Sequence, residues 1–216
     1  YGQYQTTTGV CTTMSEKIEL FRHDCFPSGL FWCDYDLPAD LQEEIIECIM
    51  PFEKLNQNNY HGHGFTTYHT IQNFLEQEGL LSINQFITDM VQTVHNTVRL
   101  RGNVYIKDSW ATVGEKYSWH GRHNHLPNLW SGVFYVQADD ESSPIEFIDK
   151  NKDSNWPWHF KTEENQYTAK SIQCETKTGR LYIFPSYFDH SVKEYKGNSK
   201  RITIAFNCNA TVEENV

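Results

Sequence analysis

The second half of the chain is a succession of short segments in which apolar and polar residues alternate. Turn residues separate one segment from the next. Many short strands bounded by turn signals are typical of a barrel or a sandwich, so this pattern constrains the fold most strongly. Strands are expected at 103–107, 109–117, 122–126, 130–137, 144–148, 168–175, 179–184, 187–193 and 200–208.

Two helices are expected before these strands. Residues 37–50 place Pro38 in the first turn, crowd acids into the N-terminal half and carry an apolar stripe. Residues 81–100 keep a 3.6-residue apolar rhythm, with Ser82 as candidate N-cap and Gly102 beyond the end. Helices followed by strands predict an α+β fold that is mostly β. We expect a double-stranded β-helix (a cupin-like jelly roll) with the N-terminal helices packed on one face.

Length and composition narrow the classes of function. A chain of 216 residues suffices for one substantial domain, which we expect at 14–216. Residues 1–13 contain no acid or base and are expected to be a flexible extension. A net charge of −10 disfavours partners that are nucleic acids or anionic membranes. Six scattered cysteines, with no CxxC pair and no signal-peptide pattern, indicate reduced thiols and a cytoplasmic location.

Three histidines lie close together in residues 119–136, just before the apolar segment that ends at Val136. His123 and His125 are two residues apart, which in a strand puts both imidazoles on one face, ~7 Å apart along the chain. Neutral imidazole binds borderline metal ions well, whereas two adjacent imidazoles pack poorly. His190, far downstream, is the candidate third ligand. The three histidines together predict one metal site, which the HxH pair alone would not.

Arg201 lies eleven positions after His190, in another alternating strand. Thr203 points to the same side of that strand, so the two side chains can share one anion. The alternative is an ordinary charged residue on a strand surface. Tyr135 is a candidate for the wall of the same pocket or for barrel filling.

These segments resemble the Fe(II)/2-oxoglutarate-dependent oxygenase superfamily, in particular a branch of small, mostly uncharacterised prokaryotic and phage-type proteins. The resemblance covers about residues 20–207. It implies that His123 is the first iron ligand, that His125 stands where the family has an acid, and that His190 is the distal ligand. It also implies that Arg201 and Thr203 bind the far carboxylate of 2-oxoglutarate, beside Tyr135. The resemblance is carried by Trp110, HNHLPNLWSGVFYV, PIEFID, GRLYIFPSYFDHSV and RITIAFN.

The function implied is that of a non-haem iron dioxygenase. Such an enzyme couples oxidative decarboxylation of 2-oxoglutarate to hydroxylation of a substrate, with Fe(II) and 2-oxoglutarate as cofactors and dioxygen consumed. The substrate would be a small molecule or a protein side chain, and the acidic net charge favours a neutral or basic one. His125 in place of an acid leaves the site one negative charge short.

Two alternatives stay open. One is a three-histidine cupin-type metalloenzyme that uses no keto acid and needs no Arg201. The other is a non-catalytic jelly-roll module that binds a sugar or a protein through the loop carrying Trp156 and Trp158. A second HxH pair, His61 and His63, lies among glycines and is expected in a polar surface loop or, alternatively, in a lid.

Overall fold

The computed structural model describes residues 9–12, 17–20, 28–56, 59–60, 63–139, 141–150, 163 and 168–211. Its main feature is a six-stranded antiparallel sheet with the order β3-β10-β7-β12-β5-β4, which faces a four-stranded sheet with the order β6-β11-β8-β9. The strands of the large sheet are β3 (Phe31–Asp34), β4 (Gly64–Thr66), β5 (Asn103–Gly114), β7 (Trp130–Gln137), β10 (Arg180–Pro185) and β12 (Arg201–Thr211). Those of the small sheet are β6 (His120–His123), β8 (Ile145–Ile148), β9 (Ser171–Cys174) and β11 (Asp189–Val192).

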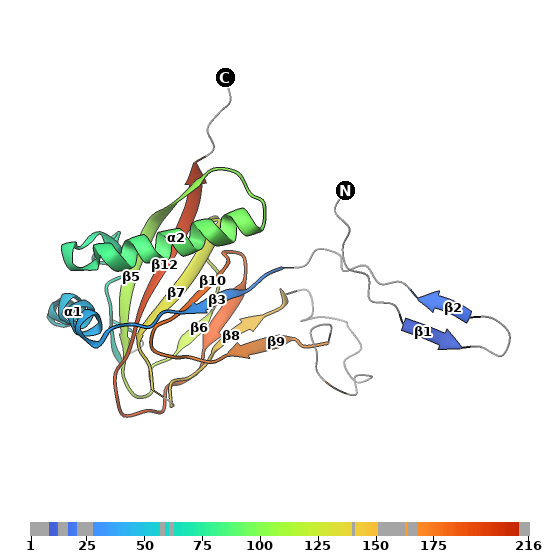
Figure 1. The fold of residues 1–216 in the computed structure, drawn as a ribbon. Coiled ribbons are helices and arrows are strands. Elements are labelled where there is room, and N and C mark those ends of the chain that lie inside the picture. The colour runs from blue at the N-terminus through green and yellow to red at the C-terminus, as the bar shows by residue number, and fades with distance from the viewer. Residues whose placement is uncertain are drawn as a thin grey trace, which may run out of the picture.

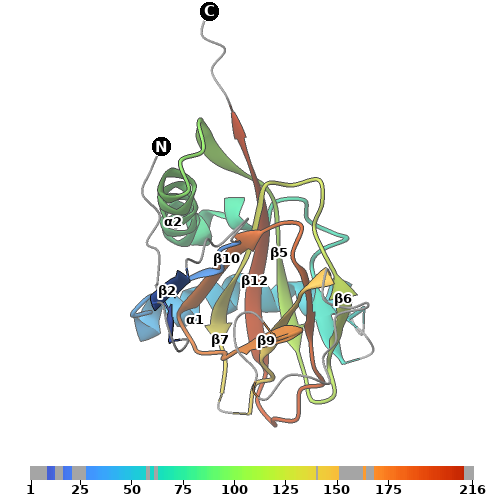
Figure 2. The ribbon, with the colours of Figure 1, turned by 90° about the vertical axis from the view of Figure 1, so that its right-hand side faces the viewer.

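The outer face of the large sheet packs on two helices, α1 (Ala39–Ile49) and α2 (Leu81–Thr97). Alternate residues of a strand point to opposite faces, so β12 directs Ile202, Ile204 and Phe206 toward the helices. Figure 1 shows α2 crossing β5, β12 and β7. Figure 2 shows α2 and β6 on opposite sides of the large sheet. This apolar face is the main core of the molecule.

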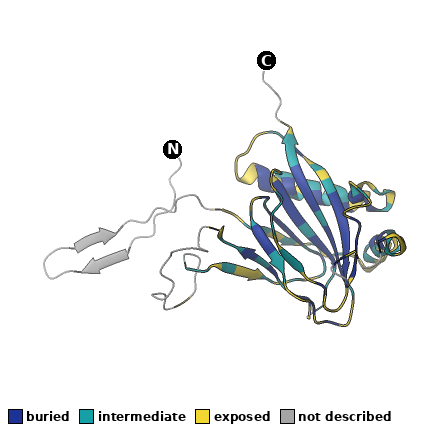
Figure 3. Cartoon of the chain, turned by 180° about the vertical axis from the view of Figure 1, so that it is seen from behind, coloured by how far each residue is buried: buried dark blue, intermediate teal, exposed yellow. Residues whose placement is uncertain are grey.

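The inner face of the large sheet meets the small sheet through a second, smaller apolar cluster. Tyr135, Tyr182 and Phe184 of the large sheet pack with Ile145 and Phe147 of the small one. Figure 3 shows the buried residues concentrated along the strands of the large sheet. Two antiparallel sheets packed face to face, with helices on one outer side, confirm the predicted jelly-roll class and its mostly β character.

The helices agree with the predicted ranges except at their ends. Ser82 is not the N-cap of α2, because the helix begins at Leu81, directly after a 3-10 turn (Glu78–Leu80), and no side chain caps it. The helix ends at Thr97, two residues before Arg99 adopts a positive φ of 60°. The prediction that it reaches residue 100 is therefore wrong.

Most strands occur where the alternation predicted them, with three differences. The expected strands 103–107 and 109–117 form one continuous strand, β5, which pairs along the whole of β12. The expected strand 122–126 ends at His123. The loop expected to be polar and exposed contains β4, whose three residues are all buried, so that expectation is wrong for Gly64–Thr66.

Three predictions about the remaining segments have different outcomes. His63 is exposed, as expected of a surface loop, whereas His61, Trp156 and Trp158 lie outside the described residues. Within the described part of residues 1–20, β1 (Gly9–Thr12) and β2 (Lys17–Leu20) pair with each other. The division into an extension and one domain stays a prediction. No helix in the described part of the chain has the length and apolar character needed to cross a membrane.

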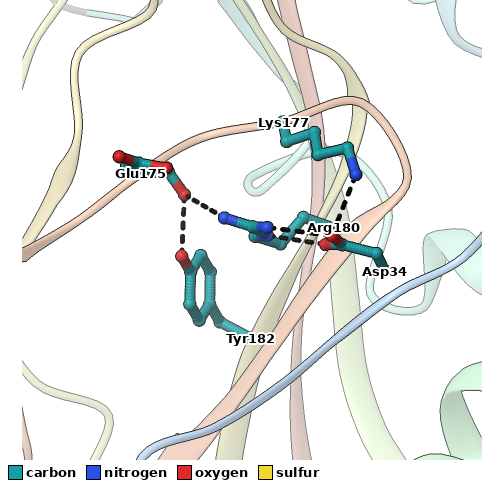
Figure 4. A network of polar contacts seen from close by, with 5 residues as sticks. All are labelled: Asp34, Glu175, Lys177, Arg180 and Tyr182. Carbon is teal, nitrogen blue, oxygen red and sulfur yellow. Dashed lines mark hydrogen bonds and ion pairs between the residues drawn. The ribbon is translucent and has the colours of Figure 1, made fainter.

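Ion pairs fix β3 at the edge of the large sheet (Figure 4). The Arg180 guanidinium donates to both carboxylate oxygens of Asp34, at 2.6 and 2.9 Å, and Lys177 Nζ lies 2.9 Å from the same carboxylate. These hydrogen bonds hold the pKa of Asp34 well below its ordinary value. Beside them, Tyr182 Oη donates to the Glu175 carbonyl at 2.7 Å, which orients its ring toward the inner face.

Gly132 allows the closest packing in the large sheet. It lies opposite Phe206 in β12, and an added Cβ would come within 2.3 Å of the Phe206 ring and 2.5 Å of the Tyr182 carbonyl oxygen. We expect Gly132→Ala to lower the free energy of unfolding by about 1–3 kcal/mol or more, because the clash involves backbone. Urea unfolding measures this loss. Gly121→Ala is the control, since its Cβ would meet only the edge of the exposed Trp119 ring, at 3.3 Å. Equal losses in both variants would contradict the packing argument.

Candidate active site

Two of the predicted metal ligands are brought together by strand pairing. His190 in β11 lies directly opposite His123 in β6, in an antiparallel pair. Side chains of directly opposed residues lie on the same face and contact each other, and here the ring centroids are 4.2 Å apart. The His190 ring also lies 4.9 Å from the Phe184 ring of the large sheet, so it points into the space between the two sheets.

His125 joins this pair from the loop that follows β6. Its backbone N–H donates to the Ser186 carbonyl at 2.8 Å, which fixes the loop against the end of β10. Its ring centroid lies 4.9 Å from that of His123 and 5.0 Å from that of His190. One ring nitrogen from each of the three histidines lies within 4.8 Å of the others. The predicted triad is therefore assembled, although His125 is not in a strand as expected.

Hydrogen bonds to backbone carbonyls orient two of the three imidazoles. His123 Nδ1 lies 2.8 Å from the Gly121 carbonyl oxygen, and His190 Nδ1 lies 3.1 Å from that of Phe188. A carbonyl can only accept, so each Nδ1 carries the proton and each Nε2 keeps its lone pair. Metal-binding histidines are usually oriented in this way, by a hydrogen bond from the ring N–H that does not face the metal.

Burial keeps the triad neutral at pH 7. Loss of solvation, together with neighbouring imidazoles, lowers the pKa of His125 to about 3 and that of His190 to about 3. Burial also lowers the pKa of His123. Neutral imidazole is the form that binds a metal ion. The donor set therefore fits Fe(II), which accepts imidazole ligands.

Asp189, next to His190 in sequence, does not take part in the triad. Its carboxylate accepts from Lys150 at 2.8 Å, from Arg122 at 2.9 Å and from Asn124 at 2.9 Å. Partial burial raises its pKa, but these hydrogen bonds outweigh burial and hold the pKa at about 2. Asp189 therefore does not orient His190, whose ring is oriented by the hydrogen bond to the Phe188 carbonyl.

Arg201 is buried at the inner face of the large sheet. It is 4% exposed and opens β12, opposite Gly114 of β5. Its guanidinium carbon lies 5.9 Å from the centre of the Tyr195 ring. No carboxylate among the described residues forms a salt bridge with it. The alternative of a surface charge is therefore wrong, and a buried cation of this kind calls for an anionic partner.

Thr203 and Tyr135 lie beside Arg201 on the same inner face. They are directly opposite each other in the pairing of β12 with β7, and both are buried. Burial raises the pKa of Tyr135, an effect that the positive charge of Arg201 opposes. Neither hydroxyl forms a hydrogen bond with another described residue. Three polar side chains on this face are thus available to a ligand.

Tyr60 and His120 also lie beside the triad. The His120 ring stacks on that of His123 at 4.2 Å, although strand alternation predicts that they point apart. Tyr60 Oη lies 3.4 Å from His120 Nδ1, and Arg201 lowers the pKa of Tyr60 against the larger effect of burial. Tyr60 is 5% exposed, and its polar sequence surroundings contain no periodic signal of that burial.

An aromatic wall leads from the triad to the surface. The Trp110 ring lies 5.8 Å from that of His125 and 4.9 Å from that of Tyr68, which is half exposed. Trp110 is itself buried, so it forms the inner part of this wall.

Comparison with known protein families finds a match over part of the chain. A family model described as "Putative 2OG-Fe(II) oxygenase" matches residues 108–207, which contain the triad and Arg201. No curated protein matches the chain. Over residues 108–207 the chain is therefore similar to the 2OG-Fe(II) oxygenase superfamily. Fe(II) and 2-oxoglutarate are the cofactors of that superfamily, and the superfamily resemblance found in the sequence is confirmed.

Solved oxygenase structures share the fold at low sequence identity. HygX from Streptomyces hygroscopicus, with nickel and 2-oxoglutarate bound, aligns with a TM-score of 0.59 at 8% identity, over 85% of this chain and 83% of HygX. A Pseudomonas putida prolyl-4-hydroxylase aligns with a TM-score of 0.56 at 14% identity, over 85% and 94%. The carbocyclase SnoK from nogalamycin biosynthesis aligns with a TM-score of 0.61 at 9% identity, over 84% and 79%.

The depressed histidine pKa values predict how acid affects the metal-free oxygenase. In the unfolded chain a histidine titrates near pH 6.5, whereas folded His125 and His190 stay neutral down to about pH 3. The unfolded state then binds more protons, so the free energy of unfolding falls as pH drops below about 6.5. The slope is up to about 1.4 kcal/mol per pH unit for each histidine.

Urea unfolding of the metal-free protein at several pH values measures this slope. His125→Gln should lose stability less steeply than the unsubstituted protein, because it removes one of these groups. His63→Gln, at an exposed position, should follow the unsubstituted protein. Three parallel curves would show that His125 is not held neutral by the fold.

Proposed function

We propose that this oxygenase is a non-haem iron dioxygenase that couples oxidative decarboxylation of 2-oxoglutarate to hydroxylation of an organic substrate. The observation that carries the proposal is that two groups between the sheets, the histidine triad and the Arg201 guanidinium, are each suited to bind a ligand of opposite charge. Three neutral imidazoles offer lone pairs to a cation, and the buried Arg201 guanidinium has no carboxylate partner among the described residues.

His123, His125 and His190 are the proposed metal ligands. Three ligands on one side leave other coordination positions open, as non-haem iron oxygenases require. When bound, Fe(II) and 2-oxoglutarate supply the oxidising chemistry. The protein residues orient the ligand atoms and keep them unprotonated. Burial and the hydrogen bonds to the Gly121 and Phe188 carbonyls both serve this purpose.

Arg201 is the proposed anchor for the far carboxylate of 2-oxoglutarate. A guanidinium can donate two parallel hydrogen bonds to a carboxylate, which fixes its orientation as well as its charge. Thr203 and Tyr135 face the same pocket from paired positions of β12 and β7 and are the proposed additional donors. A three-histidine cupin enzyme without a keto acid would leave the charge of Arg201 uncompensated.

The proposed substrate is a small molecule or a protein side chain that enters along the wall formed by Tyr68 and Trp110. The acidic net charge of −10 favours a neutral or basic substrate. Cys33, Cys48, Cys174 and Cys208 are free thiols, as expected of a protein in the cytoplasm.

The direct test is anaerobic addition of Fe(II) and then 2-oxoglutarate. We expect the visible charge-transfer band of an iron–keto acid chelate. Absence of the band in a protein that binds iron would favour the three-histidine enzyme without a keto acid. Absence of iron binding as well would favour the non-catalytic module.

Removing any one triad histidine should remove most of the bound iron. We expect this of His123→Ala, His125→Ala and His190→Ala, because two remaining imidazoles hold a divalent ion much less tightly than three. Iron content after gel filtration, together with the melting temperature, measures the effect. His63→Ala is the matched control, an exposed histidine outside the triad. Retention of iron in all three triad variants would refute this ligand set.

Removing the Arg201 guanidinium should weaken 2-oxoglutarate binding and leave iron binding unchanged. Loss of one partner of a buried charge pair costs ~2–5 kcal/mol, which is roughly 30- to 5000-fold in affinity. Lys should recover part of the loss, as a point charge without the second hydrogen bond. An anaerobic 2-oxoglutarate titration compares wild-type protein with Arg201→Ala and Arg201→Lys. Equal affinity in all three would remove Arg201 from the keto-acid site.

A further inference from the structure

A chain of buried hydrogen bonds on the inner face of the large sheet ends at the carboxylate of Asp108. Asn207 Nδ2 donates to Asp108 Oδ1 at 2.5 Å, and Asn207 Oδ1 accepts from Ser131 Oγ at 2.7 Å. Ser131 Oγ lies 2.6 Å from Ser186 Oγ. Asn207, Ser131 and Ser186 are buried, whereas Asp108 is half-buried. Three buried polar side chains therefore orient one partly exposed acid.

The proton donors of this chain are all directed toward Asp108. A carboxylate can only accept, so the Asn207 amide turns its NH2 group to Asp108 and its oxygen to Ser131. Only one oxygen of Asp108 is used in this way. Oδ2 accepts from no residue in the described part of the chain, and no cation there forms an ion pair with this acid. A solvated surface charge needs no such orientation, whereas a binding group does.

Strand register places Asp108 beside the triad. Asp108 and Trp110 are two residues apart where β5 pairs regularly with β12, so both side chains lie on the inner face, about 7 Å apart along the strand. The Trp110 ring lies 5.8 Å from that of His125. Arg201, in contrast, pairs with the last residue of β5, about 20 Å further along the strand. Asp108 is therefore near the triad and remote from Arg201.

The aromatic wall formed by Trp110 and Tyr68 stands next to this acid. Its rings offer an apolar surface, and the faces of Trp and Tyr rings also attract cations. A carboxylate accepts strong hydrogen bonds from a protonated amine. An oriented acid beside aromatic rings is thus suited to an ammonium group and the carbon atoms attached to it. The net charge of −10 adds a general attraction for cations.

We infer that Asp108 binds a protonated amino group of the substrate, and that the substrate is a primary amine whose apolar part lies along Trp110. Asp108 Oδ2 accepts from the ammonium group while Asn207 holds Oδ1. The inference rests on the proposed function and deepens it, because it names the class of substrate presented to the triad. Asp108 determines specificity and contacts neither the metal nor the keto acid.

The first measurement is a calorimetric titration of the metal-free protein at pH 7 with benzylammonium and with benzyl alcohol, which have nearly the same shape. Wild-type protein should bind benzylammonium about 5- to 50-fold more tightly, a range between an exposed ion pair and a buried charge-assisted hydrogen bond. Asp108→Asn keeps an oxygen that accepts from Asn207 and removes the charge. It should bind both probes equally weakly.

The matched control is Asp36→Asn, which removes the same charge from an exposed position between β3 and α1. It should keep the wild-type preference for benzylammonium, because the general field of the protein changes by the same amount in both variants. Loss of the preference in Asp36→Asn as well would attribute it to net charge and overturn the inference.

The second measurement locates the bound amine. Fe(II) is paramagnetic and broadens the NMR signals of nearby protons, so iron loading should broaden the signals of benzylammonium in wild-type protein and much less in Asp108→Asn. The peptide acetyl-Gly-Lys-Gly-amide carries the same ammonium group on a protein-like backbone. Tighter binding of either carrier supports the inference and shows whether a free amine or a lysine side chain is the source of that group.

The inference and the proposed function fail on different results. Equal affinity of wild-type protein for benzylammonium and benzyl alcohol overturns the inference, and so does an unchanged preference in Asp108→Asn. Charge-dependent binding without broadening by bound iron also overturns it, since the amine then lies away from the triad. The proposed function fails if the protein binds no iron, or gives no charge-transfer band with 2-oxoglutarate, whatever the calorimetry shows.

Discussion

The pairing of β12 with β5 on one side and β7 on the other is the constraint on which the rest of the structure depends. Because side chains alternate along a strand, this pairing sorts β12 into two faces. Ile202 and its apolar alternates join the helix-covered core, while Arg201 and Thr203 face the small sheet. A slip of one residue would bury the guanidinium under the helices and expose the core to the pocket. Fold stability and site geometry are therefore specified by the same register.

The alternation of apolar and polar residues made the strands predictable, and two of these strands hold His123 and His190 of the triad. The approach of His123 to His190 could not be derived from sequence, because it depends on the register of β6 against β11, two strands joined by no hairpin. The burial of Arg201 could not be predicted for a similar reason. A charged residue in an alternating strand can lie equally well on a solvent-exposed face or on a face that another sheet covers. The burial of Tyr60 could not be predicted from its sequence surroundings, because it comes from contacts with distant elements. The 3-10 turn before α2 overrode the capping preference of Ser82, which is a tertiary effect on a local rule.

Burial prepares the two halves of the site in opposite ways. On the small sheet it removes protons from imidazoles and so exposes lone pairs to a cation. On the large sheet it surrounds the permanent positive charge of Arg201 with tyrosines, and no carboxylate in the described part of the chain pairs with that charge. Each arrangement is unfavourable in the ligand-free protein, and each is relieved by a ligand of the appropriate charge. In a site organised in this way, the free-energy cost of arranging the binding groups is met when the protein folds. The ligand therefore needs to induce little reorganisation when it binds.

The charge balance of the proposed site follows from His125. Three neutral imidazoles leave the two positive charges of Fe(II) without a negative ligand, and Asp189 is already saturated by Arg122, Lys150 and Asn124. On the proposed function, the dianion 2-oxoglutarate would place one carboxylate at the metal and one at Arg201, and would so neutralise charge at both ends of the site. An ion and a dianion that each relieve the charge of the other bind cooperatively, and the coupling acts equally on both. On the proposed function, a histidine in place of the acid therefore makes iron retention depend on the keto acid more than an acid ligand would.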